Sequence, residues 1–192
     1  MRKNTILIFT FFIASSFSSV WNALVIQTES PKSAKETNYL SVTTDSKNEK
    51  VTTFILTRHA EKENDGTSDP KLSEAGLKRA IQLSEMLSDT KIDKIISTPY
   101  KRTRETVRQI AEKAGLEIGT YDHRDKKLLS SLLKANEGGT IVISGHSNTI
   151  PVLVNQLTGS NKYAQLDEDE YDKLFIVSCT KVGNGSEVVL IY

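Results

Sequence analysis

Short apolar runs rich in β-branched residues recur along the chain from position 53 onward and predict the strands of a sheet. Runs of this length, bounded by polar or turn-forming residues, are typical of buried strands. The predicted strands are 53–57, 92–97, 118–121, 140–144, 174–178 and 187–191. Among them, 140–144 (Thr-Ile-Val-Ile-Ser) has the clearest pattern of a buried strand.

Between these runs the apolar positions change to the spacing of helices. Ser73 is expected to open a first helix, and Gly115 stands where the residue just past the end of a second helix belongs. Residues 128–133 predict a third helix, closed by the glycines at 138–139, and residues 150–157 predict a fourth. The expected buried face of the first helix consists of apolar or small residues, namely Leu77, Ala80, Ile81, Ser84 and Leu87. Strands separated by helices indicate βαβ units, so the predicted fold is α/β: a three-layer α/β/α sandwich with a mostly parallel sheet.

The first residues of the chain have the pattern of a signal peptide, which we expect to span residues 1–23. Two basic residues precede a mostly apolar stretch at 6–14, and Ser16 and Ser18 suit a signal peptidase, with Ala23 as another cleavage point. A retained membrane anchor is the alternative, but serines interrupt the apolar run before it reaches the length of a bilayer span. The sequence therefore predicts an exported protein, periplasmic or extracellular, without stable membrane insertion after cleavage.

Within the segment 24–50, residues 28–50 are rich in Ser, Thr, Lys and Glu and contain few apolar residues. Such a segment buries too little apolar surface to offset the entropy lost on ordering, so we expect a disordered linker. The predicted folded domain therefore comprises residues 51–192.

Composition removes several classes of function. The chain has 192 residues with 25 Lys and Arg against 24 Asp and Glu, a formal net charge of +1, so no nucleic-acid partner is predicted. Cys179 is the only cysteine, which excludes a disulfide scaffold within the chain. Three histidines are few for a histidine-rich metal site, and no metal is predicted.

Two histidines directly follow two predicted strands. Arg58-His59 comes after the strand at 53–57, and Gly145-His146 comes after the strand at 140–144. A single loop histidine is commonly a surface residue. Because open α/β sheets bind ligands outside the carboxyl ends of their strands, two histidines in such positions indicate a functional site.

Four short segments carry a more specific pattern. Residues 56–62 read LTRHAEK, 69–76 read DPKLSEAG, 97–106 read STPYKRTRET, and 145–149 read GHSNT. In this order they resemble the Arg-His-Gly signature, the "LTxxG" helix start, the second-arginine segment and the second-histidine motif of the histidine phosphatase superfamily, which has the phosphoglycerate-mutase-like fold. The resemblance extends over most of the predicted domain and departs from the family pattern at Ala60, where glycine is usual.

The resemblance implies a role for four residues in phosphoryl transfer. His59 would be the nucleophile that forms a covalent phosphohistidine, and Arg58 and Arg102 would hold the phosphate oxygens through their planar guanidinium groups. His146 would donate a further hydrogen bond to the phosphate as charge develops. No cofactor or divalent metal is needed for this chemistry. Arg104 and Arg108, on the same predicted helix as Arg102, are expected to be solvated.

The general acid is left open by the sequence, because the family takes it from an Asp or Glu whose position varies. Asp122, at the end of the strand predicted at 118–121, is the first candidate, and Glu61 is the second. The alternative for Asp122 is an N-cap ahead of the helix at Leu128. His123, beside it, is expected to be a surface residue.

Within the superfamily the sequence favours a hydrolase over a mutase, because the segment between Arg102 and His146 is too short for a large lid. The small size resembles the short branch, which includes an exported group. We therefore expect a metal-independent phosphatase acting on a small phosphorylated substrate. Two alternatives stay open: a phosphohistidine or phosphoprotein phosphatase, and a non-catalytic protein that binds a phosphorylated ligand. The sequence predicts no particular natural substrate or oligomeric state.

Overall fold

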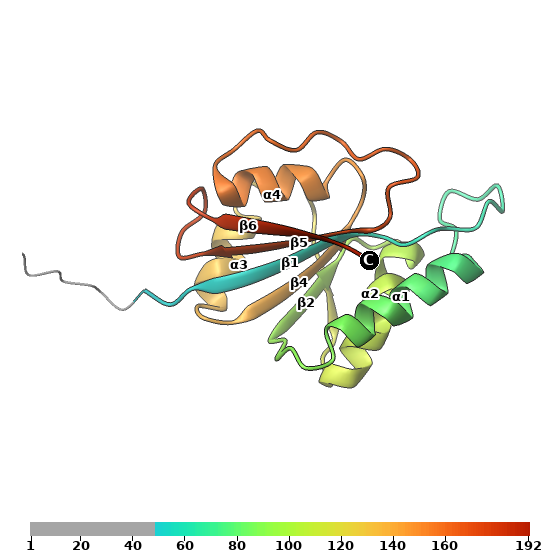
Figure 1. The fold of residues 1–192 in the computed structure, drawn as a ribbon, viewed down its shortest axis with the longest axis horizontal. Helices are drawn as coiled ribbons and strands as arrows, with labels where there is room; N and C mark the ends of the chain where they lie inside the picture. Colours follow the sequence, from blue (N-terminus) through green and yellow to red (C-terminus); the bar gives the residue numbers. More distant parts are fainter. Residues whose placement is uncertain (1–48) are drawn as a thin grey trace, which may run out of the picture. The chain divides into compact units, whose positions relative to one another are not determined.

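The computed structural model describes residues 49–192, so the predicted signal peptide and nearly all of the predicted linker lie outside the described residues. The described residues contain a six-stranded sheet with the strand order β3-β2-β4-β1-β5-β6 (Figure 1). Its strands are β1 (Thr52–Arg58), β2 (Lys94–Ser97), β3 (Ile118–Thr120), β4 (Thr140–Gly145), β5 (Lys173–Cys179) and β6 (Ser186–Ile191). In this part of the chain, no helix combines the length and the apolar character that crossing a membrane would require.

Strand direction brings the predicted site residues to one edge. β1, β4, β2 and β3 are mutually parallel, whereas β5 runs antiparallel to β1, and β6 runs antiparallel to β5. The register pairs Arg58 with Gly145 and Ser97 with Ser144. The carboxyl ends of β1, β4 and β2 therefore lie side by side, and the chain leaves the sheet there into His59, His146 and Thr98.

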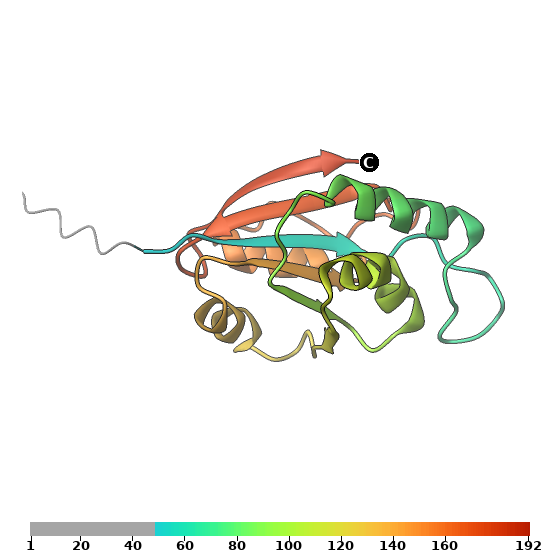
Figure 2. The same cartoon turned by 90° about the horizontal axis from the view of Figure 1, so that it is seen from below.

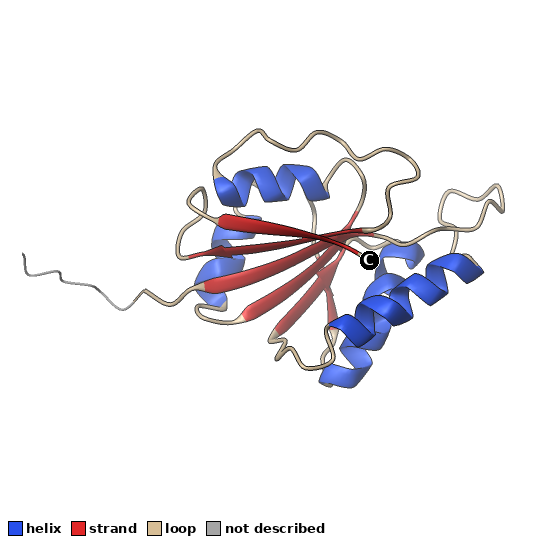
Figure 3. Cartoon of the chain, viewed as in Figure 1, coloured by secondary structure: helices blue, strands red, loops and turns tan. Residues whose placement is uncertain are grey.

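Four helices cover the two faces of the sheet (Figure 3), which confirms the predicted three-layer α/β/α fold. They are α1 (Glu74–Met86), α2 (Lys101–Ala114), α3 (Leu128–Ala135) and α4 (Ile150–Thr158). One buried cluster joins α1 and α2 to the sheet through Leu83, Val107 and Val142, and another joins α3 and α4 through Leu129 and Leu153. In Figure 2, α1 and α2 lie in front of the sheet and α4 lies behind it.

Local sequence explains where the two helices nearest the site begin and end. The Ser73 hydroxyl caps α1 by accepting a hydrogen bond from the Gly76 N–H, and Gly115 ends α2 with a left-handed φ of 66°. The prediction was wrong for part of α1, since Leu77 and Ile81 are 42% and 40% exposed. Leu83, which the prediction omitted, is fully buried instead.

Candidate active site

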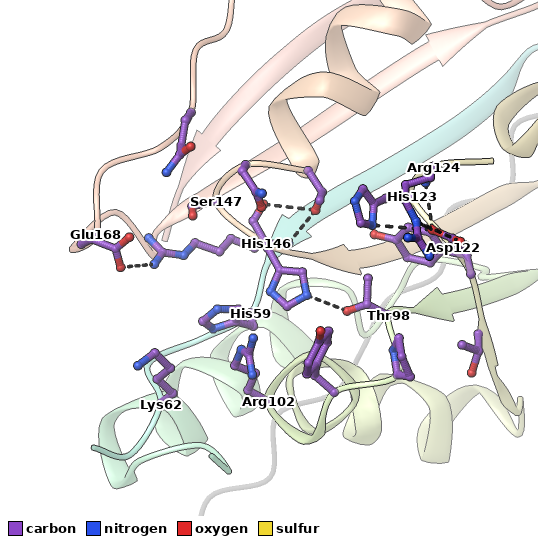
Figure 4. Close-up of a pocket in the computed structure, with 18 residues that line it drawn as sticks. His59, Lys62, Thr98, Arg102, Asp122, His123, Arg124, His146, Ser147 and Glu168 are labelled. Atoms are coloured by element: carbon purple, nitrogen blue, oxygen red, sulfur yellow. Dashed lines mark hydrogen bonds and ion pairs between the residues drawn. The ribbon is translucent and has the colours of Figure 1, made fainter. Parts of the chain in front are cut away.

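A cavity of about 730 Å³ opens at the carboxyl edge of the sheet, and the predicted site residues line it (Figure 4). Its walls come from the ends of β1, β2, β3 and β4, the first turn of α2, and the loop between α4 and β5. The structure thus brings together His59, His146, Arg58, Arg102 and Asp122, whereas Glu61 does not line this cavity.

His59 is buried and held as a neutral imidazole. Its Nδ1–H donates a hydrogen bond to the Ala60 carbonyl at 2.8 Å, so the proton lies on Nδ1 and the lone pair on Nε2. The pKa of His59 falls to about 3. Burial is the largest cause, and the charges of Arg102 and Arg58 act in the same direction, whereas the hydrogen bond to Ala60 acts against them. At neutral pH Nε2 of this imidazole is therefore unprotonated, which is the state that a nucleophilic histidine requires.

The alanine that replaces the usual glycine at position 60 fits the fold. Ala60 is fully buried in a small apolar cluster with Leu72 and Ala80. Its N–H donates a hydrogen bond to the Thr106 hydroxyl on α2 at 3.0 Å. The departure from the family pattern is thus accommodated by packing, without opening the site.

Arg58 is 2% exposed, and the loop between α4 and β5 fixes its guanidinium. Nη1 donates to the carbonyl oxygens of Asp167 at 2.6 Å and Glu170 at 3.1 Å, and the ring of Tyr171 packs 4.1 Å from the guanidinium carbon. Nη2 lies 3.4 Å from the exposed carboxylate of Glu168. The buried Nε has no hydrogen-bond partner among the described residues.

Arg102 extends from the first turn of α2 and packs against the ring of Tyr100, 4.5 Å away. Its nearest carboxylate is Asp69, at 3.6 Å from Nη1. Its buried Nε and Nη1 have no hydrogen-bond partner among the described residues. Buried donors are nearly always paired in proteins, so the unpaired nitrogens of Arg58 and Arg102 indicate a site for an anion such as phosphate.

His146 completes the group from the end of β4. Its main-chain N–H donates to the Thr149 hydroxyl at 2.9 Å, and its ring Nε2 lies 2.9 Å from the Thr98 hydroxyl. The rings of His146 and His59 have centroids 5.5 Å apart. Burial, followed by the charge of Arg102, lowers the pKa of His146 to about 4, so its ring is also neutral at neutral pH.

Asp122 lines the cavity, but its carboxylate is bound to Arg124. The guanidinium and main-chain N–H of Arg124 donate to it at 2.9–3.0 Å and hold the pKa of Asp122 at about 2. In this arrangement the carboxylate is ionised and holds no proton to donate. The N-cap alternative was wrong, because α3 begins at Leu128 after Lys127, and Lys127 makes no side-chain cap.

Glu61, the second candidate acid, is bound to Arg79, which lies in the middle of α1. Nε of Arg79 lies 3.0 Å from both carboxylate oxygens, and Nη2 lies 2.8 Å from one of them. Although burial alone raises the pKa of Glu61, the hydrogen bonds and charge of Arg79 bring it below its ordinary value. Glu61 therefore forms a structural ion pair with Arg79, two residues after His59.

The two arginines expected to be solvated lie outside the cavity. Arg104 donates to the Thr120 hydroxyl at 3.3 Å, and Arg108 pairs with Glu112 at 3.3 Å. His123 is exposed, as expected, but it also lines the cavity. Within residues 49–192, no three His, Cys, Asp or Glu side chains are grouped as they would be to hold a metal ion.

Sequence reasoning missed several residues of the site. They are Lys62, Thr98, Tyr100, Gln165, Glu168 and Tyr171. Thr98 directly follows the strand predicted at 92–97, so the same strand-end argument that selected the two histidines could have found it. The residues of the loop before β5 do not follow a strand, so the strand-end argument could not have found them. They reach Arg58 because β5 pairs antiparallel with β1, which places the start of β5 beside the end of β1.

Part of the chain is similar in sequence to known phosphatases. Residues 54–123 match the histidine phosphatase superfamily (branch 1), a span that includes Arg58, His59 and Arg102. Phosphoserine phosphatase 1 from Hydrogenobacter thermophilus is 46% identical over 71 residues. That match covers 34% of this chain and 34% of the relative, so it spans only about a third of the relative's length.

Solved structures share the fold across the whole domain. A mycobacterial glucosyl-3-phosphoglycerate phosphatase superimposes with a TM-score of 0.61 at 15% identity, covering 74% of this chain and 99% of its own. The protein histidine phosphatase SixA, complexed with tungstate, gives a TM-score of 0.60 at 19% identity, covering 72% and 96%. Residues 54–123 are therefore similar in sequence to the histidine phosphatase superfamily, and the described domain shares the fold of these solved phosphatases.

Proposed function

We propose that the protein is a phosphatase that hydrolyses phosphomonoesters through a phosphohistidine intermediate on His59. The observation that carries this proposal is the state of His59: a buried imidazole with its proton on Nδ1 and its lone pair on Nε2, beside two arginines with unpaired donors. A protein that only binds phosphate has no need of an unprotonated nucleophile in this position. The geometry therefore favours catalysis over the non-catalytic alternative.

The proposed reaction has two steps. The unpaired nitrogens of Arg58 and Arg102 hold the phosphate oxygens, and Nε2 of His59 attacks phosphorus while the bond to the leaving oxygen breaks. Water then attacks the phosphohistidine, the N–P bond breaks, and its electron pair returns to Nε2. The fixed positive charge of the two guanidinium groups stabilises the charge that develops on the phosphate oxygens in both steps.

A small phosphorylated molecule is the substrate class that we propose. The cavity, at about 730 Å³, has the size of a small-molecule site. Lys62 and His123 line its walls beyond the phosphate-binding arginines, where they can meet further polar groups of a substrate. Relatives and structural neighbours named for phosphoserine and for glucosyl-3-phosphoglycerate support small phosphomonoesters as the first compounds to test.

Phosphohistidine is a second candidate substrate, favoured by one observation. Neither Asp122 nor Glu61 holds a proton at neutral pH, because each is paired with an arginine. When the other ring nitrogen of a phosphohistidine carries a proton, cleavage of the N–P bond releases a neutral imidazole and needs no general acid. The neighbour named a protein histidine phosphatase is consistent with this candidate.

The test is a substrate panel with the full chain, comprising p-nitrophenyl phosphate, phosphoserine, 3-phosphoglycerate and a phosphohistidine peptide. A rapid alkaline denaturing quench with ³²P-labelled substrate is expected to trap label on wild-type His59, and His59→Ala is expected to abolish both label and turnover. Loss of a covalent route reduces kcat by orders of magnitude, so a variant that keeps more than about a tenth of kcat would falsify the proposal.

We also propose that the protein is exported and belongs to the short exported branch of the superfamily. The support is the basic, apolar and small-residue pattern of residues 1–23. Cell fractionation and N-terminal sequencing of the mature protein test this directly. A mature chain that begins after residue 16, 18 or 23 supports cleavage, and a chain that keeps its first residues in the cytoplasm contradicts it.

A further inference from the structure

The hydroxyls of two buried threonines form a hydrogen-bond chain from the ring of His146 to the main chain at Tyr100. Thr98 lies just before α2, and Thr103 lies within it. The Thr103 hydroxyl donates to the carbonyl oxygen of Tyr100 at 2.9 Å, and the Thr98 hydroxyl donates to Oγ1 of Thr103 at 3.0 Å. Nε2 of His146 lies 2.9 Å from Oγ1 of Thr98 (Figure 4). A hydroxyl has one proton, and that of Thr98 is already donated to Thr103. Thr98 therefore accepts the hydrogen bond, and Nε2 of His146 is the donor.

This arrangement fixes the tautomer of His146. A neutral imidazole with its proton on Nε2 has its lone pair on Nδ1, which has no hydrogen-bond partner among the described residues. In Figure 4 the ring lies between Thr98 and His59. His59 has the opposite tautomer, with its proton on Nδ1. The site therefore presents two unprotonated ring nitrogens, one on each histidine.

The charges around His146 determine when Nδ1 takes up a proton. Arg102, His123 and Arg58 face the ring and disfavour its charged form, and burial acts in the same direction. His59 faces it as a neutral ring, and Tyr100 packs edge-on at 5.1 Å. A phosphate dianion bound between the arginines has the opposite charge, so it favours the protonated ring. Proton uptake at Nδ1 is thereby coupled to the presence of phosphate.

We propose that Thr98, supported by Thr103, is a positioning residue that holds His146 in the Nε2–H tautomer, so that Nδ1 carries the reaction's proton. The proton-carrier role rests on the proposed phosphatase function, whereas the tautomer does not. His146 would thus supply the proton that the carboxylates of Asp122 and Glu61 cannot donate. With Asp122 and Glu61 ionised, neither can supply a proton, whereas the Nδ1 lone pair of His146 can take up a proton from bound phosphate and give it up again.

The protons balance without any further reactant. A phosphomonoester has its second pKa near about 6, so a fraction of it enters as the monoanion. Its P–OH proton passes to Nδ1 of His146 and from there to the leaving oxygen, as the P–O bond breaks and the bond from His59 to phosphorus forms. In the second step water gives one proton to Nδ1, its oxygen bonds to phosphorus, and the N–P bond breaks. The proton on Nδ1 leaves with inorganic phosphate.

The tautomer is tested first, by NMR of the full chain with ¹⁵N-labelled histidine and no substrate. We expect wild-type His146 to show a protonated Nε2 and an unprotonated Nδ1. Thr98→Val removes the acceptor at nearly constant volume and is expected to give a mixture of tautomers, while Thr98→Ser restores the wild-type signal. Thr90→Val, at an exposed threonine that does not line the cavity, is the matched control. A Thr98→Val variant with an unchanged His146 signal overturns the proposal.

The proton-carrier role is tested by kinetics on two substrates. For Thr98→Val we expect kcat for phosphoserine to fall at least about tenfold more than kcat for p-nitrophenyl phosphate, with little change in KM, because an alkoxide needs a proton and a nitrophenolate does not. Thr103→Val, which leaves the Thr98 hydroxyl in place, is expected to show the same split at a smaller size. Equal losses on both substrates overturn the role. A wild-type chain that hydrolyses neither overturns the phosphatase function and this role together, and the NMR result then decides the tautomer separately.

Discussion

Both carboxylate oxygens of Asp122 are bound by the guanidinium of Arg124, two residues later in the chain. Nε of Arg124 lies 3.0 Å from Oδ1, and Nη2 lies 2.9 Å from Oδ2. This paired geometry holds the pKa of Asp122 at about 2. A carboxyl group in this state is a hydrogen-bond acceptor at the cavity wall and has no proton for a leaving group.

The first prediction follows for Asp122→Asn. We expect it to slow alkyl and aryl phosphates by similar factors, each less than about tenfold, whereas loss of a true general acid typically costs about 10²–10⁴-fold on the poor leaving group. Asp125→Asn, which alters a neighbouring exposed carboxylate, is the control. A selective loss on phosphoserine compared with p-nitrophenyl phosphate would restore Asp122 as the acid.

The second prediction concerns the two arginines that we propose bind phosphate. Arg58→Lys and Arg102→Lys keep the charge but remove the planar set of donors, so we expect each to lower kcat/KM about 10- to 100-fold, the range expected for a lost charged hydrogen bond. Arg104→Lys is the matched control on the same helix and is expected to be nearly silent, because Arg104 lies outside the cavity. Similar losses at Arg102 and Arg104 would show that the assignment along α2 is wrong.

The third prediction concerns Gly145, the last residue of β4. A Cβ atom there would lie 2.6 Å from the hydroxyl of Tyr121 and 2.8 Å from Oγ1 of Thr149, so Gly145→Ala must displace the segment that holds His146. Overpacking of this kind costs about 1–3 kcal/mol, and we expect a lower Tm together with reduced kcat. Gly119→Ala is the control, because its nearest contact, 3.4 Å from an Ile96 methyl, is an ordinary one. Equal Tm values for the two variants would contradict the prediction.

The fourth prediction concerns stability against pH. The pKa values of His59 and His146 fall from 6.5 to about 3 and about 4 in the folded protein, so below pH 6.5 the unfolded chain binds more protons. The two histidines contribute fully to the free energy of unfolding above pH 6.5. This contribution is lost as the pH falls below 6.5, and the free energy of unfolding then decreases by at most about 1.4 kcal/mol per pH unit for each histidine.

Urea unfolding between about pH 7 and about pH 5 measures this slope, in a range above that where the carboxyl groups titrate. The double variant His59→Gln/His146→Gln is expected to flatten it. His123→Gln, which removes an exposed imidazole from the same cavity, is the control. A slope that is the same in the wild-type protein and the double variant would rule out the two site histidines as its source.

Much of the fold was predictable because the elements near the site carry strong local signals. Ser73 caps α1 and Gly115 ends α2 as their sequence positions predicted. The buried strands β1 and β4 are nearly continuous apolar runs, which is the pattern of a parallel sheet covered on both faces. The exposed face of α1 was mispredicted at Leu77, because helical spacing does not tell which side of a partly apolar helix meets the sheet.

The site was predictable in part for a related reason. Residues that follow parallel strands meet at one edge, so the strand ends alone pointed to His59 and His146. The state of a carboxylate depends on partners that strand order does not reveal. Asp122 was selected for its position at the end of β3, and its pairing with Arg124 is visible only in the structure.

The contacts of Arg58 have a consequence for how substrate preference can change. The same guanidinium binds the main-chain carbonyls of Asp167 and Glu170, and its buried Nε has no partner among the described residues. Under the proposed role of Arg58 in binding phosphate, phosphate affinity and the packing of residues 159–172 are linked, each altering the other by the same free energy. Substitutions in this segment that never touch a substrate can tune how tightly its phosphate is held. Substitutions in residues 159–172 can therefore change substrate selectivity while His59 and His146 stay the same.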